Sequence, residues 1–318
     1  MSGLMLAAFG LAGSAFADSV WSPAPPPQAA ALEDGRPLVP VRVGKGSGNG
    51  SENGRPDADS PFAFIVDSAA SHSVIYDTLV SRLGLESVPG ASIPVTTAAG
   101  RRLRPVYDVG SLSAFGVTLP IGRTVALSDR TRGAAHGLIG VDLLRGRMLV
   151  LAGGAPRLIM GGEAPASDGE AGPWQAVQGR PVGRGSIAVD MRIDLPDGGR
   201  RTVPAILDTG ASHTILTPAA ARGLARHQGR DVRVESDGLP VPGRPVQVPG
   251  LALGGLHVAG VPAIAADLPV FRRFGVGADT SAALIGMDLL SRVDVALDFR
   301  QWRLWWRPPK ESADPGGS

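Results

Sequence analysis

The chain of 318 residues contains no cysteine. Disulfide bonds, thiol nucleophiles and cysteine-ligated zinc are therefore excluded, although the redox compartment stays open. Beyond its first residues, the chain also has no run of about 18 apolar residues, the length that a membrane-spanning helix requires. We therefore expect no stable membrane insertion.

The chain lacks a large excess of charge of either sign. Lys and Arg together number 31, Asp and Glu number 29, and the formal net charge is +2. So small a surplus is weak evidence for a nucleic-acid partner, and we expect none. Glycine and proline, by contrast, are abundant at 44 and 28 residues. Short apolar runs separated by these residues favour β architecture, and the length suffices for two domains.

The other features of the sequence are organised around residues 205–212. This stretch is typical of a buried strand that ends in a carboxylate, a hydroxyl and a glycine. A carboxylate is costly to bury, so one in this position is usually either paired or used. Residues 64–71 have the same pattern, 208 − 67 = 141 positions earlier. The acidic motifs of the two halves are Asp67, Ser68 and Ala69, and Asp208, Thr209 and Gly210.

A second feature repeats at nearly the same offset. Residues 138–144 recur as residues 284–290, which is 284 − 138 = 146 positions later, and both begin with Leu-Ile-Gly. Two ordered features at similar offsets indicate an internal duplication.

With these motifs the chain resembles the aspartic proteases, in a retropepsin-like or pepsin-like form with both halves in one polypeptide. In that family each half supplies Asp-Thr/Ser-Gly after an apolar strand, and a motif of two apolar residues and a glycine packs beneath the catalytic loop. The motifs bracket most of residues 38–306. The first half departs from the pattern at Ala69, which occupies the glycine position and bears on activity more than on fold.

The resemblance implies an all-β fold of two pseudo-symmetric lobes, each closed and β-barrel-like, with short helices and a central cleft. Residues 1–17 have the apolar stretch and small-x-small cleavage pattern of a secretory signal, although they contain no Lys or Arg. We therefore expect export, to the periplasm or the medium. The predicted boundaries are the signal at 1–17, the lobes at 32–160 and 186–308, a linker at 161–185 and a disordered tail at 309–318.

Local patterns place the motifs on elements. Residues 74–83 and 218–224 have helical patterns, and a mobile insertion is expected at 44–61. Residues 95–101 resemble the family's flap hairpin, with Ala99 and Gly100 near its tip, and residues 232–241 are a looser counterpart in the second half. Strands are expected at 38–43, 62–66, 187–193, 202–207 and 295–306.

The resemblance implies that Asp67 and Asp208 form a catalytic dyad. Two neighbouring carboxyl groups cannot both ionise, so one keeps a proton while the other acts as a base toward water. Such hydrolysis needs no cofactor and no metal. The alternative is a purely structural role, in which either Asp stabilises a turn.

Further residues would support the dyad. We expect the hydroxyls of Ser68 and Thr209 to form hydrogen bonds across the axis, and Gly210 to leave room beside the carboxylates. The hydroxyls of Ser71 and Ser212 are expected to brace the two acids.

Four other groups of residues have alternative interpretations. His72 and His213 could complete a metal site with the two acids, but both lead into a predicted helix and should point away from the axis. Asp142 and Asp288 are explained by helix capping. Trp302, Trp305 and Trp306 could mark a partner surface, but we favour a role in the core. Arg101, Arg102 and Arg104 could bind an acidic substrate, but we favour a solvent-exposed face.

The predicted function is aspartic-type endopeptidase, acting on a peptide or protein substrate as a monomer whose halves form an intrachain pseudo-dimer. The alternative is a catalytically weakened peptide-binding or scaffold protein on the same fold, because of Ala69.

Overall fold

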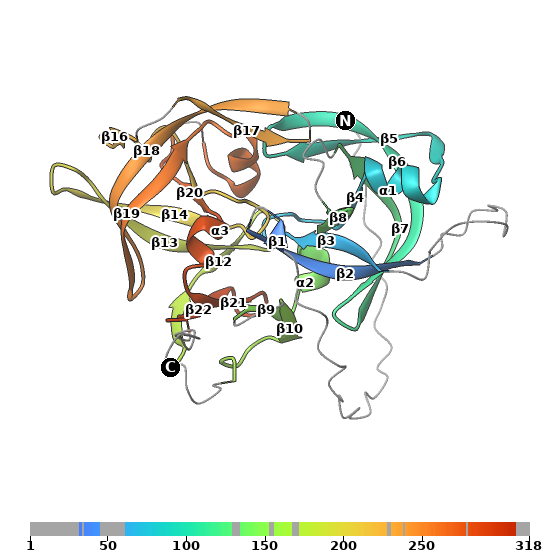
Figure 1. Cartoon of the computed structure of the whole chain (residues 1–318), viewed down its shortest axis with the longest axis horizontal. Helices are drawn as coiled ribbons and strands as arrows, with labels where there is room; N and C mark the ends of the chain where they lie inside the picture. The colour runs from blue at the N-terminus through green and yellow to red at the C-terminus, as the bar shows by residue number, and fades with distance from the viewer. Residues whose placement is uncertain are drawn as a thin grey trace, which may run out of the picture.

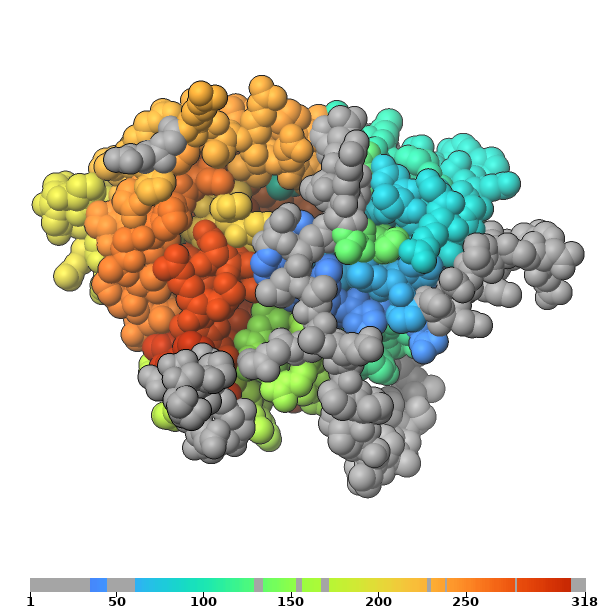
Figure 2. All heavy atoms as spheres, viewed as in Figure 1, coloured from blue at the N-terminus to red at the C-terminus, as the bar shows by residue number. Residues whose placement is uncertain are grey.

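The computed structural model describes residues 32–33, 35–44, 61–128, 134–152, 156–166, 172–227, 230–237, 239–277 and 279–309. The predicted signal, most of the predicted insertion and nearly all of the predicted tail lie outside these residues. The described chain is built mostly of strands, arranged in two lobes (Figure 1). In the space-filling view the blue-to-green first half and the orange-to-red second half lie on opposite sides of the molecule (Figure 2).

The first lobe contains one eight-stranded sheet with the order β1-β2-β3-β8-β4-β7-β6-β5. An additional pairing of β2 with β6 joins two strands that lie far apart in this order. The elements of the lobe are β1 (Leu32–Glu33), β2 (Arg36–Gly44), β3 (Phe62–Val66), β4 (Val74–Tyr76), α1 (Asp77–Leu83), β5 (Ser87–Thr97), β6 (Gly100–Ala114), β7 (Val117–Leu127), β8 (Gly137–Ile139) and α2 (Val141–Leu144).

The second lobe repeats this plan in a nine-stranded sheet with the order β12-β13-β14-β20-β15-β19-β18-β16, and β17 pairs with β18. Here β13 pairs additionally with β18. The elements are β12 (Arg180–Val182), β13 (Ser186–Asp194), β14 (Arg200–Leu207), β15 (Ile215–Leu216), β16 (Ala225–Arg226), β17 (Val232–Ser236), β18 (Leu239–Leu253), β19 (Leu256–Ala265), η1 (Pro269–Phe274), β20 (Ala283–Ile285) and α3 (Met287–Leu290).

A third sheet, which the sequence did not predict, joins the two halves. Its order is β10-β9-β21-β22-β11, and β9 of the first half pairs with β21 of the second. The strands are β9 (Arg147–Leu151), β10 (Arg157–Met160), β11 (Gln175–Gln178), β21 (Asp294–Asp298) and β22 (Arg303–Arg307). Trp305 and Trp306 are buried in it, and Trp302 packs against the core, which confirms the core interpretation of these tryptophans.

The strands that carry the acidic motifs are buried on both faces, which explains their unbroken apolar sequences. On β3, Phe64 and Val66 join the main hydrophobic core, whereas Ile65 packs into a separate cluster on the other face. On β14, Leu207 joins the main core and Ile206 the opposite cluster. Two buried faces fix each strand in register, so its terminal aspartate emerges at a defined point.

Two local expectations, a helix at 218–224 and a single strand at 295–306, were wrong. Residues 218–224 form turns instead of a helix: Gly223 has a φ of +81°, and the Arg201 guanidinium donates hydrogen bonds to the carbonyls of Ala219, Ala220 and Arg222. The stretch 161–185, expected to be a linker, contains β11 and β12. Residues 295–306 fold as a hairpin, β21 and β22, instead of one strand. Within the described residues, no helix has the length and apolar character needed to cross a bilayer.

Candidate active site

Each acidic motif lies in a loop that leaves a buried strand and docks on the Leu-Ile-Gly strand of its own lobe. β3 runs parallel to β8, and β14 runs parallel to β20. The register continues into the loops, because the Asp67 N–H donates to the Ile139 carbonyl at 2.8 Å and the Asp208 N–H donates to the Ile285 carbonyl at 2.9 Å. The repeated sequence motifs therefore meet in space, once in each lobe.

Reciprocal hydrogen bonds join the two loops across the lobe interface. The Ser68 N–H donates to Thr209 Oγ1 at 3.0 Å, and the Thr209 N–H donates to Ser68 Oγ at 2.9 Å. Each hydroxyl in turn donates to a backbone carbonyl of the other lobe, Ser68 to Leu207 at 2.7 Å and Thr209 to Val66 at 2.5 Å. Both residues are fully buried. These bonds are the ones expected from the sequence, and they fix the two aspartates relative to each other.

The two carboxyl groups face each other but have different partners. Asp67 Oδ1 accepts hydrogen bonds from the N–H groups of Ala69 at 2.9 Å and Ala70 at 2.7 Å. Asp208 Oδ1 accepts one from Gly210 at 2.9 Å. A Cβ built on Gly210 would lie 2.4 Å from Asp67 Cγ, so the glycine lets the second loop approach the opposite carboxylate.

Burial raises the pKa of both aspartates, and the pKa of Asp208 is raised further than that of Asp67. For Asp208 the charge of Asp67, and a hydrogen bond shared with its carboxyl group, add to the effect of burial and hold its pKa well above the usual range. For Asp67 the raising effect of burial is opposed by the two backbone N–H groups and by the positive charges of Arg36 and Arg273. The arrangement therefore favours a proton on Asp208 and a negative charge on Asp67.

The glycines of the Leu-Ile-Gly motifs allow close packing beneath the acidic loops. A Cβ on Gly140 would lie 2.6 Å from the backbone carbon of His72, and one on Gly286 would lie 2.5 Å from that of His213. No larger residue fits either position without moving the loop. This arrangement is the packing that the resemblance implied.

Asp142 and Asp288 have a role that sequence reasoning missed. Asp142 accepts from the N–H of Ser73 at 2.8 Å and from its hydroxyl at 2.7 Å; Asp288 accepts from the same groups of Thr214 at 2.9 and 2.7 Å. Neither short helix has a side-chain cap, and the N-cap residues are glycines. The helix-capping interpretation was therefore wrong, because these acids brace the far ends of the two loops.

The expectation for Ser71 and Ser212 is not met in the described residues. Ser71 Oγ accepts a hydrogen bond from Arg273 Nη2 at 2.5 Å, and among the described residues no hydrogen bond connects either serine hydroxyl to the carboxylate of Asp67 or Asp208. Both serines do line the cleft. Sequence reasoning missed Arg273 because it lies in η1, 273 − 67 = 206 positions after Asp67, where no local pattern marks it.

The two histidines do not converge on the dyad. His72 and His213 are exposed, and no group of three or more His, Asp or Glu side chains arranged to hold a metal occurs in the described part of the chain. Burial lowers the pKa of His72, and the nearby charge of Arg184 lowers it further against the opposing charge of Asp142.

A cleft of about 1180 Å³ lies over the dyad and is lined by both lobes. The hairpin of β5 and β6 covers it from the first lobe, and the hairpin of β17 and β18 from the second. Ala98 lines the cleft, whereas Ala99 and Gly100, the predicted tip residues, do not. Instead, Gly100 faces the second hairpin, where a Cβ on it would lie 3.3 Å from Leu239 Cδ1.

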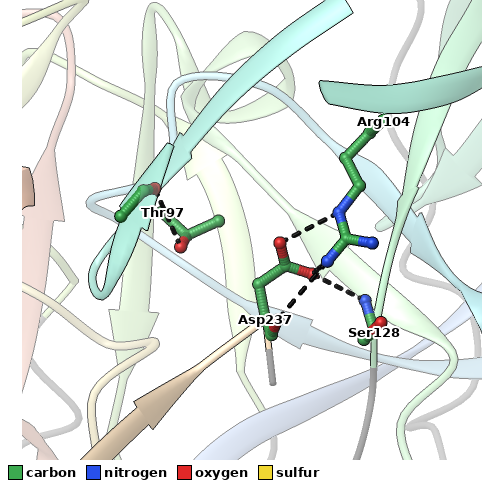
Figure 3. Close-up of polar contacts among 5 residues, drawn as sticks. Thr97, Arg104, Ser128 and Asp237 are labelled. Carbon is green, nitrogen blue, oxygen red and sulfur yellow. Dashed lines mark hydrogen bonds and ion pairs between the residues drawn. The ribbon is translucent and has the colours of Figure 1, made fainter. Parts of the chain in front are cut away.

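A buried ion pair links the two flap hairpins (Figure 3). Arg104 donates through Nε to Asp237 Oδ2 at 2.9 Å, and its Nη2 contacts Asp237 Oδ1. The Ser128 N–H donates to the same Oδ1 at 2.8 Å. Arg104 is therefore not part of a solvated face, as the sequence suggested, although Arg101 and Arg102 are exposed.

Comparison with known proteins agrees with this architecture. The family described as aspartyl protease matches residues 49–143 and again residues 189–289, together more than half of the chain. Each match contains one acidic motif and one Leu-Ile-Gly motif. No match was found among curated proteins. The chain therefore belongs to the aspartyl protease family, with one family unit in each half.

Proposed function

We propose that the protein is an active aspartic endopeptidase in which Asp67 and Asp208 share one proton and activate a water molecule. The observation that carries this proposal is the reciprocal hydrogen bonding of Ser68 and Thr209, which holds two carboxyl groups together at the floor of a cleft. Such a pair supplies an acid and a base to one peptide bond.

The different surroundings of the two acids support a division of roles. Asp67, near Arg36 and Arg273, is the base that removes a proton from water as its oxygen attacks the scissile carbonyl carbon. Asp208, with its raised pKa, is the acid that donates its proton to the carbonyl oxygen. The protonated Asp67 then gives its proton to the leaving amine as the C–N bond breaks, and Asp208 recovers a proton from the diol. The dyad returns to its starting state with one water consumed.

The test is cleavage of a peptide library by the purified full chain, read by mass spectrometry. Asp67→Asn and Asp208→Asn should each lower kcat by about a thousandfold or more, because either change removes one member of a pair that acts as a unit. The matched control is Asp190→Asn, the same substitution at an exposed aspartate on β13. A statine-type inhibitor should block cleavage, and a chelator should not. Cleavage that survives in either dyad variant contradicts the proposed mechanism.

We also propose that the monomer is the active species. The main hydrophobic core and the third sheet contain residues of both halves, so one chain assembles the whole dyad. Specific activity should therefore be independent of enzyme concentration. A steep loss of activity on dilution would indicate an obligate dimer.

The alternative, a peptide-binding protein without efficient catalysis, rests on Ala69. Among the described residues, the non-glycine residues with positive φ are Phe115, Asp237 and Trp302. Ala69 thus adopts a backbone conformation open to any residue, and its N–H still donates to Asp67. Both observations favour an active enzyme over a peptide-binding protein that has lost catalysis.

A further inference from the structure

Two arginines lie beside the Asp67 loop in a small hollow of about 260 Å³ at the edge of the cleft. Arg184 is in the turn between β12 and β13, and Arg273 is in η1. The other residues that line the hollow carry no charge: Ala69, Ser71, Gly183, Ser186 and Phe274. The turn is held in place, because the Arg145 guanidinium donates to the Arg184 carbonyl at 3.3 Å.

Neither guanidinium is paired with a carboxylate in the described part of the chain. Arg273 donates to the Thr96 carbonyl at 2.9 Å and to the Ser71 hydroxyl, both of which are neutral. Arg184 Nη1 lies 3.4 Å from His72 Nε2, and the lowered pKa of His72 favours its neutral form. Within the described residues the charge of Asp67 thus acts on Arg273, but no carboxylate lines the hollow or forms an ion pair with either arginine.

The two positive charges repel each other. Burial lowers the pKa of Arg273, and the charge of Arg184 lowers it further, while Asp67 acts in the opposite direction. Bringing two like charges together at a partly buried position is unfavourable unless an anion joins them. An arrangement of this kind, in a hollow that opens to an active-site cleft, is suited to a ligand carboxylate.

We propose that Arg184 and Arg273 form an anionic subsite that binds a carboxylate of the peptide substrate next to the scissile bond. The proposal rests on the peptidase function proposed above. The carboxylate has two possible sources in a peptide, the side chain of Asp or Glu and the free C-terminus. Arg104 does not compete for this role, because Asp237 already neutralises it.

The two arginines differ in their contacts with the first flap, and this difference determines which of them is suitable for substitution. Arg273 anchors the first flap through Thr96, so its replacement changes the flap as well as the charge. Arg184 is exposed, and within the described part of the chain its side chain forms no hydrogen bond with either flap. Arg184 is therefore the residue to replace, and Arg273→Lys serves as a second variant that keeps the charge and loses the planar fork.

The experiment compares peptides that differ only by Glu, Gln or Lys at each position around the cleaved bond, and by a free or amidated C-terminus. For the unmodified protein, kcat/KM should be about tenfold or more higher for Glu than for Gln at one position, because hydrogen bonds to charged groups contribute this much. Arg184→Gln should remove most of the preference, and Arg184→Glu should favour Lys. Arg233→Gln, at another arginine that lines the cleft, should leave the preference unchanged. A preference for the free over the amidated C-terminus would assign the subsite to the terminal carboxylate.

A binding measurement separates failure of the subsite from failure of the proposed function. Statine-containing, uncleavable versions of the Glu and Gln peptides are titrated into the protein and into Arg184→Gln. A Glu preference that Arg184→Gln abolishes supports the subsite even if no peptide is cleaved, in which case only the peptidase proposal fails. Equal binding of acidic and neutral peptides overturns the subsite, even if the protein cleaves peptides efficiently.

Discussion

The two acidic loops have the same scaffold and different surroundings. In both, the aspartate N–H binds the Leu-Ile-Gly strand, a buried hydroxyl reaches across the interface, and a second aspartate braces the loop end. Only the first carboxylate, however, has Arg36 and Arg273 nearby, and only the second has its pKa raised by the charge of its counterpart. The comparison teaches that duplication supplies the geometry, whereas residues outside the duplicated motifs, Arg36 and Arg273, give the two carboxyl groups different electrostatic surroundings.

The third position of the motif shows the same asymmetry. Gly210 lies against the Asp67 carboxylate, where a Cβ would be 2.5 Å from Oδ2. Ala69 occupies the corresponding position in the first loop, and its methyl group packs against the cluster of the second lobe that contains Ile206. One motif position is therefore closed to a side chain and the other open to it.

Apart from replacement of the two aspartates, the largest effect is expected from single substitutions at these two positions. Gly210→Ala should lower kcat/KM by about a hundredfold, because the new methyl group must displace Asp67 from its position in the dyad. Ala69→Gly should leave activity close to that of the parent and lower the free energy of unfolding by about 0.4–1 kcal/mol, through the greater freedom of the unfolded chain. Both variants are measured on one cleaved peptide and in urea.

The two variants also test whether the natural protein is an enzyme. Catalysis that appears only in Ala69→Gly would identify the parent as a peptide-binding protein without catalytic activity. Full activity in Gly210→Ala would show that the close approach of the second loop is dispensable.

The next effect concerns the bonds between the loops. Ser68→Ala and Thr209→Val should each lower the free energy of unfolding by about 1–3 kcal/mol, since each leaves a buried N–H of the other loop without its partner. The double variant should lose less free energy of unfolding than the two single variants lose together, because the two hydroxyls act in one network. Thr209→Ser is the matched control, which retains the hydroxyl. Additive losses in urea denaturation would mean that the two hydroxyls stabilise the loops independently.

The sequence predicted the motifs and their strands well because these features are local. The strand at 62–66 is reproduced as β3, and the cross-loop bonds of Ser68 and Thr209 follow from the duplicated pattern. The third sheet, the brace formed by Asp142 and the position of Arg273 depend on contacts between distant segments. Such contacts leave no periodic signal in one sequence, because they arise only when the lobes pack together.

A third prediction concerns pH and the proton that Asp208 holds. Its pKa is raised from 3.8 in the folded state, so the folded protein binds more protons than the unfolded chain between 3.8 and that raised pKa. The free energy of unfolding should therefore fall as pH rises through this window. Asp208→Asn cannot titrate, so the variant should lose this contribution to the slope and be more stable than the parent at neutral pH.

Asp67→Asn should gain less stability, because the positive charges of Arg36 and Arg273 favour the charged form of Asp67, whereas the charge of Asp67 disfavours the charged form of Asp208. Urea denaturation of both variants and the parent across pH measures the difference. On the proposed mechanism, kcat/KM of the parent should fall at high pH as the pair loses its shared proton and at low pH as it gains a second one. Equal stabilisation by the two asparagines would refute the assigned division of roles.

The smallest effect is expected at the contact between the flaps, where the two halves meet above the cleft (Figure 3). The side chains of Arg104 and Asp237 are 15% and 2% exposed, so each depends on the other for neutralisation. Asp237 has a φ of +53°, a conformation that asparagine also tolerates, so Asp237→Asn changes the charge without adding backbone strain. Arg104→Gln and Asp237→Asn should each change kcat/KM by less than about tenfold, and the pair should show a coupling of about 0.5–3 kcal/mol in the free energy of unfolding.

Hydrogen exchange of residues 96–104 should become faster in both variants, because the first flap loses its ion pair with the second lobe while Arg273 still binds Thr96. Unchanged exchange together with zero coupling would show that the hairpins close over the cleft without this ion pair.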